Sequence, residues 1–252
     1  MYKIPANTLF IGKKVIFMPE CHSTNSLALE VCQQSHVPEG TLVITDRQTA
    51  GRGQRGNTWE SQPGMNLTFS VIVKPTFLAI KDQFSLSMIT SLAVHNYLAE
   101  TCDHAVYIKW PNDILIKQFK ICGILIENQL VGEKLTNAVI GIGLNVNQQQ
   151  FSVPKATSLS IVLDKKLDLQ DVLEGLLSHL ESKYLQLRQG KLKVLKEDYI
   201  KNLYRFNEHH TFQAGHDQFD GKILGVDEQG RLRVLIHDEE RDFGMKEISF
   251  VD

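Results

Sequence analysis

The order of hydrophobic patterns along the chain restricts its fold more than any other feature of the sequence. Strand-like and helix-like patterns do not alternate regularly, and this argues against a doubly wound parallel sheet. Four β-like segments follow one another and two helical patterns come after them: 105–109, 113–117, 121–128 and 136–144, then about 168–188 and 191–205. The chain therefore predicts an α+β fold with a mixed β-sheet flanked by helices.

The first hundred residues supply more elements of the same kind. Ser23, Thr24 and Asn25 offer N-cap side chains to a helix that begins there. Apolar residues alternate with other residues at 67, 69, 71 and 73, which indicates a strand. The other expected elements are strands at Val15–Pro19 and Thr41–Asp46, a loop over 47–64 and a helix over 82–101.

The charge of the chain divides it into two parts. Residues 1–207 carry 22 Lys/Arg against 18 Asp/Glu, whereas residues 208–252 carry 5 against 11. The second part alternates short β segments with turns, so we expect a domain over 1–207 and a small all-β domain over 208–252. The net charge of −2 excludes a strongly basic nucleic-acid binder.

Three sequence features that would bear on the cellular compartment are absent. No apolar run reaches the roughly 18 residues of a membrane helix, and the N-terminal residues lack the apolar segment of a signal peptide. The four cysteines form no C-x-x-C pair. We therefore expect reduced thiols in a cytoplasmic protein without a membrane partner.

A glycine-rich loop matches a dinucleotide-binding pattern but lacks its context. Gly51–Gly56 reads G-x-G-x-x-G, yet Pro63-Gly64 and a strand follow where that pattern needs a helix. No Gly-Lys-Ser/Thr occurs, so a Walker A loop is excluded as well. Glycines and the guanidinium groups of Arg47, Arg52 and Arg55 suit an anion. The alternative is an exposed surface loop.

Two further segments carry polar groups between strands. One of them is Lys109-Trp110-Pro111-Asn112-Asp113, where the chain must turn at the proline. The turn either presents charged groups from the end of a sheet, or its Asn and Asp side chains only satisfy backbone groups of the turn. Lys120 precedes an apolar strand with Gly123, and Gly141 and Gly143 lie in another. Two such strands either form the walls of a narrow slot for a slender apolar ligand or only pack closely against neighbouring strands. The sequence has no G-x-S-x-G nucleophile elbow and no Cys/His spacing typical of a zinc site. The polar residues therefore suit a reaction catalysed by substrate positioning and charge stabilisation, such as nucleotidyl transfer.

In combination these segments resemble the biotin–protein ligases, the biotin–[acetyl-CoA-carboxylase] ligase family, over nearly the whole chain. The resemblance rests on Ser23-Thr24-Asn25, Gln48–Gly56 with Trp59, Lys109–Asp113, Lys120 with Gly123, and Gly141–Asn145. It implies a class II synthetase-like catalytic domain over 1–207 and a C-terminal SH3-like β-barrel over 208–252. It also implies an ATP-dependent enzyme that forms biotinyl-5′-AMP and transfers biotin to a lysine of a biotin carboxyl carrier protein or domain.

The resemblance also implies roles for individual residues. The catalytic set is Lys120, Arg52 and Asp113, with Asp113 as a site for Mg²⁺. The biotin-binding set is Ser23, Thr24, Asn25, Gln48, Gly51, Arg52, Lys120, Gly123, Leu125, Gly141 and Gly143. The nucleotide-binding set is Arg52, Gln54, Arg55, Trp59, Lys109, Asn112 and Asn145, in which Trp59 is expected to be the adenine platform. Gln54 departs from the family, in which many relatives carry arginine at the position that helps to order the loop over the adenylate.

Two other function classes remain alternatives. A lipoate–protein ligase or octanoyl transferase would share the sheet, and a non-catalytic biotin-binding protein or repressor would share the biotin site. Only 22 residues precede Ser23, so we expect no DNA-binding head and no DNA partner. A homodimer is left open.

Overall fold

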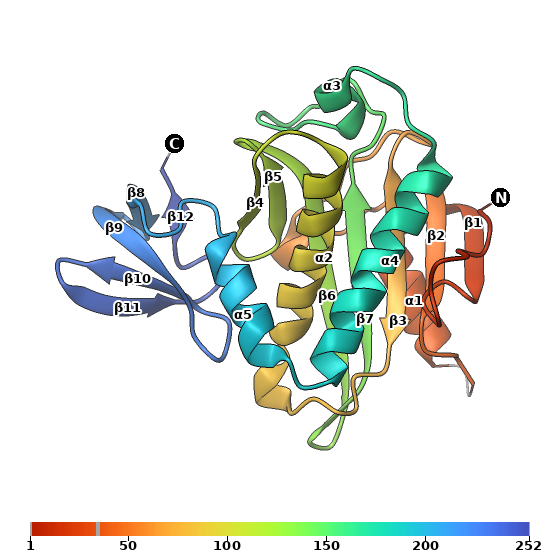
Figure 1. Cartoon of the computed structure of the whole chain (residues 1–252), viewed down its shortest axis with the longest axis horizontal. Helices are drawn as coiled ribbons and strands as arrows, with labels where there is room; N and C mark the ends of the chain where they lie inside the picture. Colours follow the sequence, from red (N-terminus) through yellow and green to blue (C-terminus); the bar gives the residue numbers. More distant parts are fainter. Residues whose placement is uncertain (1, 34–35, 252) are drawn as a thin grey trace.

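The structure is a computed structural model of the chain and describes residues 2–33 and 36–251. Its larger sheet has seven strands in the order β1-β2-β3-β7-β6-β5-β4 (Figure 1). Strand β1 pairs with β2 in parallel and the other neighbours are antiparallel, so the expected mixed sheet is confirmed. The strands are β1 (Val15–Cys21), β2 (Thr41–Gln48), β3 (Leu67–Val73), β4 (Val106–Lys109), β5 (Asp113–Ile116), β6 (Phe119–Val131) and β7 (Lys134–Leu144).

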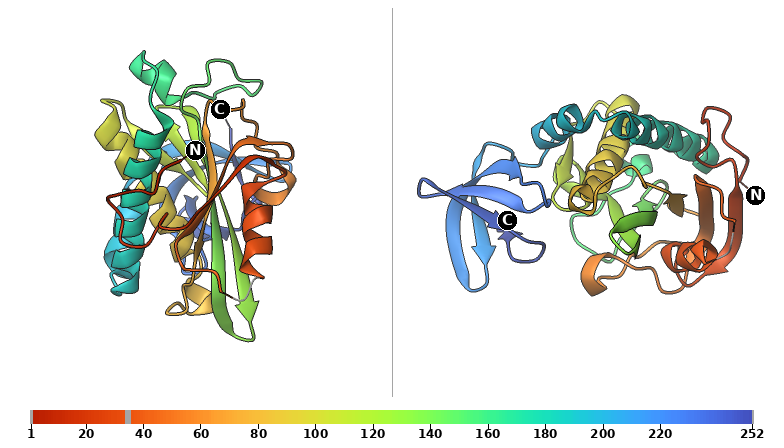
Figure 2. Two further views of the ribbon diagram at one scale, coloured as in Figure 1. Left: turned by 90° about the vertical axis from the view of Figure 1, so that its right-hand side faces the viewer. Right: turned by 90° about the horizontal axis from the view of Figure 1, so that it is seen from below.

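Helices cover both faces of this sheet. The helix α1 (Thr24–Cys32) lies on one face and α2 (Ser85–Thr101) and α4 (Leu169–Arg188) on the other, as the edge-on view shows (Figure 2). The helix α5 (Leu192–Lys201) packs against α2 and reaches the second sheet at β9. Short helices at Gln54–Gly56 (η1), Ile80–Asp82 (η2) and Leu159–Leu163 (α3) were not expected from the sequence.

The alternating pattern of β3 reflects two different cores rather than a wet and a dry face. All seven residues of the strand are buried. Phe69 and Val71 pack in the large core with the helices α2 and α4, whereas Ile72 packs with Ala28 of α1. Because side chains alternate along a strand, Thr68 and Ser70 share the face of Ile72. The polar residues of β3 therefore point toward α1 and the space beside it.

Element boundaries differ from expectation where turns decide them. Helix α2 begins at Ser85 rather than 82, after the short helix η2. Helix α5 ends at Lys201 rather than 205, because Asn202 and Tyr204 form backbone hydrogen bonds of 2.8 Å with Ile108 of β4. Strands β6 and β7 extend beyond the expected 121–128 and 136–144 and form one long hairpin.

The acidic tail forms a second, antiparallel sheet, as the expected all-β lobe requires. Its order is β11-β10-β9-β8-β12. Within the described residues β11 does not pair with β12, so hydrogen bonding does not close this sheet into a barrel. The strands are β8 (His209–Ala214), β9 (Asp217–Val226), β10 (Leu232–Ile236), β11 (Glu239–Phe243) and β12 (Ser249–Phe250).

The two sheets are joined by apolar packing at the turn between β9 and β10. Gly230 lies on the ring of Phe84, where a Cβ at residue 230 would overlap the ring. The carbonyl of Gly230 accepts a hydrogen bond from Trp110 Nε1 at 2.9 Å. The hydrophobic core is therefore continuous between the two sheets. The hydrogen bond from Trp110 also fixes the turn after β4 against the second sheet. In the described parts of the chain, no helix has the length and apolar character needed to cross a membrane.

We expect Gly230→Ala to destabilise the protein by more than about 2 kcal/mol, because the added methyl group meets Phe84 and the residue has a φ of +82°. Gly215→Ala is the matched control, since Gly215 has a φ of +60° but open space around it. The control should cost only about 1 kcal/mol. Urea unfolding of both variants measures the difference, and equal losses would contradict this account of the interface.

Candidate active site

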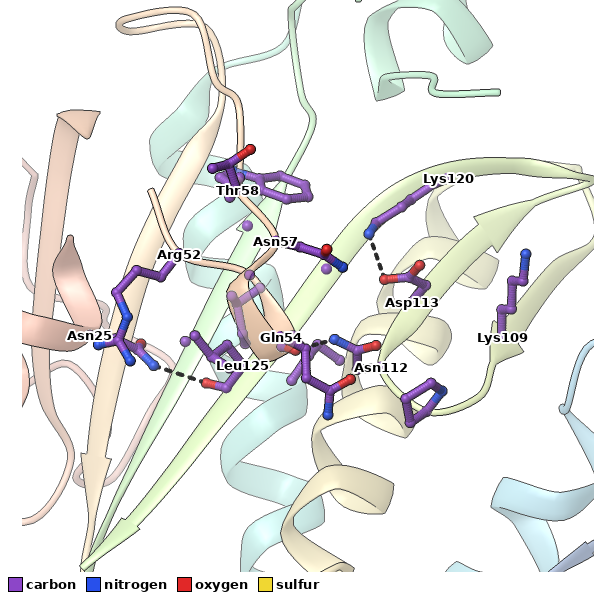
Figure 3. A pocket seen from close by; sticks show the side chains of 18 of the residues that line it. Asn25, Arg52, Gln54, Asn57, Thr58, Lys109, Asn112, Asp113, Lys120 and Leu125 are labelled. Carbon is purple, nitrogen blue, oxygen red and sulfur yellow. Dashed lines mark hydrogen bonds and ion pairs between the residues drawn. The ribbon is translucent and has the colours of Figure 1, made fainter. Parts of the chain in front are cut away.

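A cavity of about 440 Å³ opens on the α1 face of the large sheet. It lies between the loop after β2, the start of α1, strands β6 and β7, the turn after β4 and the tail of the second sheet. Figure 3 shows that Arg52 and Asn25 lie at one end of it and that Lys120, Asp113 and Lys109 lie at the other. Segments up to about 225 residues apart in the chain thus share one site.

The strand register places the two ends of this cavity in one line across the sheet. Gly123 lies directly opposite Gly143, which in turn lies opposite Thr68 on β3. On the other side Gly123 lies opposite Asp113, and Asp113 opposite Lys109. Register partners point to the same face of a sheet. The line therefore begins at the hydroxyl of Thr68, crosses the two glycines and ends at the carboxylate of Asp113 and the amine of Lys109.

The polar end of the cavity is built by α1 and β2. Gln48 Oε1 accepts hydrogen bonds from Thr24 N at 2.8 Å and Thr24 Oγ1 at 3.2 Å. Ser23 precedes the helix and is buried, and its side chain makes no capping hydrogen bond. These contacts leave the Gln48 amide nitrogen and the Ser23 hydroxyl for a bound molecule. The structure thus brings Ser23, Thr24 and Gln48 together as the sequence suggested.

The glycines of β6 and β7 make room for two other side chains. A Cβ at Gly141 would overlap Asn25 Oδ1, and a Cβ at Gly143 would overlap the ring of Trp59. The same ring covers Gly123, where a Cβ would lie 3.0 Å from it. Trp59 was expected to be the adenine platform; the structure places its ring on the glycine pair, with the Lys120 ammonium 5.7 Å from its centre. Its Nε1 is buried without a hydrogen-bond partner.

The charged end is organised around one ion pair. Lys120 Nζ lies 2.6 Å from Asp113 Oδ1, with both side chains partly exposed. Asn112 Nδ2 donates to the carbonyl of Ile124 at 2.8 Å, which fixes the turn on β6. Lys109 Nζ lies 5.0 Å from the ring centre of Phe250 in the second sheet. A second cavity of about 210 Å³ adjoins this end, and it shares Lys109, Asp113 and Lys120 with the first.

The donor set at this end suits an anion better than a protein-bound metal. Within residues 2–33 and 36–251 no three His, Cys, Asp or Glu side chains are grouped to hold a metal ion. Asp113 is the acid that lines both cavities, beside two lysines. A single carboxylate fits Mg²⁺ only where substrate phosphates supply most of the other ligands.

The glycine loop is tied down on two sides. Arg52 Nη2 lies 2.6 Å from Glu127 Oε1, and Arg52 Nη1 donates to Ser26 Oγ at 3.2 Å. Gln54 Nε2 donates to Met245 Sδ of the second sheet at 2.7 Å. Arg52 is thus held at the end of the cavity remote from Lys120. The side chain of Arg55 lies outside what the structure describes.

Two residues expected in the site do not line the cavity. Gly51 packs behind the loop, where a Cβ would overlap the Trp59 carbonyl. Asn145 is buried and donates from Nδ2 to the Thr157 carbonyl at 3.0 Å. For Gly51 the structure supports a backbone role in shaping the loop. A role for Asn145 toward nucleotide stays a prediction.

Several lining residues were not found from the sequence. Most belong to the C-terminal tail or flank known motifs without a charge or glycine to mark them: Asn57, Thr58, Thr68, Phe69, Met245, Lys246, Ile248, Ser249 and Phe250. The tail residues carry no sequence signal for the site, because only the packing of the second sheet brings them to it.

Comparison with known proteins defines the class. The model of the biotin/lipoate A/B protein ligase family matches residues 17–145, just over half of the chain. The bifunctional ligase/repressor BirA of Bacillus subtilis is 34% identical over 97% of this chain and 75% of its own length. This chain belongs to the biotin/lipoate A/B protein ligase family.

Other relatives are similar over most of their length. The biotin–[acetyl-CoA-carboxylase] ligase of Mycobacterium tuberculosis is 29% identical over 83% of this chain and 79% of its own. The solved structure of the biotin protein ligase from Aquifex aeolicus in complex with biotin and ATP superposes with a TM-score of 0.77. It is 28% identical and covers 94% of this chain and 98% of its own.

We expect Gly143→Ala to move the ring of Trp59 away from β6 and β7, since the added methyl group and the ring claim the same space. The tryptophan emission should shift to longer wavelength as the ring enters water. Trp110, the other tryptophan, is 5% exposed and should not respond. In a Trp59→Phe background the same glycine substitution should leave the emission unchanged; a shift there would contradict the assignment.

Proposed function

We propose that this protein is an ATP-dependent biotin–protein ligase that forms biotinyl-5′-AMP and transfers biotin to a lysine of a biotin carboxyl carrier domain. The observation that carries the proposal is the layout of one cavity. An amide and hydroxyl end is joined by a groove over strand glycines to an end with two lysines. Biotin has the same order of parts: a ureido ring, an aliphatic chain and a carboxylate.

The ureido ring is the part that needs hydrogen bonds most, because an unpaired buried donor or acceptor costs about 1–3 kcal/mol. Ser23, Thr24, Asn25 and Gln48 are at the end of the cavity that we assign to it. Gly123, Leu125, Gly141 and Gly143 wall the groove for the chain. The relatives named as biotin ligases support biotin over lipoate as the substrate.

In the first step an oxygen of the biotin carboxylate bonds to the α-phosphorus of ATP, and the bond from that phosphorus to the β-phosphate bridge breaks. Pyrophosphate leaves with the bonding electrons. Lys120 lies where the two anions meet, and its ammonium lowers the cost of bringing them together. The carboxylate of Asp113 orients that ammonium at 2.6 Å.

In the second step the neutral amine of the acceptor lysine bonds to the acyl carbon, loses a proton to water, and AMP leaves. The protein contributes by holding the adenylate in place for the acceptor amine. Arg52, Gln54, Arg55 and Trp59 in the loop and Lys109 and Asn112 at the turn are the residues that we assign to the nucleotide, together with Asn145. Asp113 would hold Mg²⁺, which supplies charge neutralisation on the phosphates.

The remaining assignments belong to the same proposal. Residues 1–207 form the catalytic domain, and residues 208–252 form a second domain that closes one side of the nucleotide end. Biotin, ATP and a biotin carboxyl carrier protein are the partners, without DNA, in the cytoplasm.

We expect Lys120→Ala to lower biotin-dependent exchange of pyrophosphate into ATP by about 10²–10³-fold, the usual cost of removing a group that stabilises charge at the reacting centre. Thermal unfolding should show that the fold survives, since the side chain is 39% exposed. Lys134→Ala, an exposed lysine on β7 that lines neither cavity, is the matched control. Wild-type exchange in Lys120→Ala would remove the residue from this role.

The protein should label a biotin carboxyl carrier domain with biotin, and not with lipoate, in the presence of ATP. Mass spectrometry of the carrier measures the added group, and a carrier with its acceptor lysine changed to arginine is the control. Transfer of lipoate alone would favour the lipoate–protein ligase. Binding of biotin without pyrophosphate release would favour a non-catalytic binding protein.

A further inference from the structure

Glu127 is a carboxylate that contacts two lining residues of a site proposed for two anionic substrates, and none of the roles above accounts for it. It lies on β6, two residues beyond Leu125 and four beyond Gly123, both of which line the cavity. Because side chains alternate along a strand, Glu127 faces the same side. Its side chain is 24% exposed. A negative charge there would repel the substrates unless it were neutralised and used for something else.

The two oxygens of this carboxylate bind donors from different parts of the chain. Oε1 pairs with Arg52 Nη2 of the glycine loop at 2.6 Å. Oε2 accepts from Asn25 Nδ2 of α1 at 2.9 Å. Arg52 neutralises the charge, and a hydrogen bond to an ionised partner is stronger than one between neutral groups. Glu127 therefore joins the loop to the helix that begins the polar end of the cavity.

The contact with Asn25 sets the direction of further hydrogen bonds. Asn25 Nδ2 also donates to the Leu125 carbonyl at 3.1 Å, so its Oδ1 is turned toward β3. There it accepts from Ser70 Oγ at 2.6 Å. Ser70 Oγ lies 2.8 Å from Thr24 Oγ1, which donates to Gln48 Oε1. Each hydroxyl has one proton. While Ser70 donates to Asn25, the Thr24 proton serves either Ser70 or Gln48, so the orientation of the Asn25 amide constrains the contacts of Thr24.

We propose that Glu127 is a positioning residue that couples the closed position of the glycine loop to the hydrogen-bond pattern that receives the polar ring of the substrate. The coupling runs from Arg52 through Glu127 and Asn25 to Thr24 and Gln48. Glu127 touches no reacting atom, and it acts on affinity for biotin and on loop order. The part concerning biotin rests on the proposed function, whereas the part concerning the loop does not.

Glu127→Gln tests the coupling with little change of shape. The glutamine amide has one acceptor oxygen and one donor nitrogen, so a donor must face either Arg52 or Asn25. We expect the Kd for biotin, measured by calorimetry without ATP, to rise at least about tenfold. The KM for biotin should rise more than kcat falls. Trypsin should cut within residues 47–59 several-fold faster, with thermal unfolding close to wild type.

Glu20→Gln is the matched control. It removes another Arg–Glu contact, between Arg47 and Glu20 at 2.9 Å, which lies outside the cavity with both side chains exposed. Biotin affinity and cleavage after Arg52 and Arg55 should stay at the wild-type level in this variant, whereas cleavage after Arg47 is left out of the comparison because that residue makes the control contact. Equal changes in the two variants would overturn the proposal, because they would report a general loss of surface charge.

Wild-type affinity and wild-type loop cleavage in Glu127→Gln would also overturn it. If that variant fails to fold, Arg52→Gln breaks the same contact from an exposed side chain, and trypsin can still cut after Arg47 and Arg55. Unchanged cleavage there would show that the contact does not hold the loop. If the wild-type protein binds no biotin, the proposed function fails, yet loop cleavage in the unliganded protein still decides the Arg52–Glu127 link.

Discussion

The rest of the site depends on three glycines in the middle of the large sheet, because these positions carry no side chain. Gly123 and Gly143 face each other across β6 and β7, and Gly141 lies opposite Leu125. The space above them is occupied by Trp59 from the loop and Asn25 from α1, and a Cβ at Gly141 or Gly143 would overlap one or the other. A sheet with side chains at these positions would displace Trp59 and Asn25 from the wall of the cavity.

Charge divides the groove into ends with different chemistry. Arg52 at one end is paired with Glu127, while the other end holds two lysines and one aspartate. The C-terminal part carries a net negative charge in the sequence, yet the described residues that it contributes to the cavity include no acid. It supplies Lys246 and the ring of Phe250 beside Lys109. The acidic lobe therefore contributes a cation and no acid to the charged end of the cavity.

Local patterns predicted the elements well where the pattern itself decides the structure. The mixed sheet, the helix after Ser23 and the long helix α4 follow from apolar periodicity, although Ser23 makes no capping hydrogen bond. Patterns failed where a turn or a partner decides. The extra length of the β6–β7 hairpin comes from pairing between exposed ends, and α5 ends where the chain begins to pair with Ile108 of β4.

The sequence by itself determined which residue types the site contains, since a lysine, an aspartate, strand glycines and an arginine-bearing loop are visible as motifs. Only the tertiary structure decided where they meet. Lys109, Asp113, Gly123, Gly143 and Thr68 fall into one line because of strand register, and a shift of one residue would turn each side chain to the other face. The pairing of Arg52 with Glu127 and the closing tail at Met245–Phe250 arise from contacts between distant segments. Local propensity does not encode such contacts.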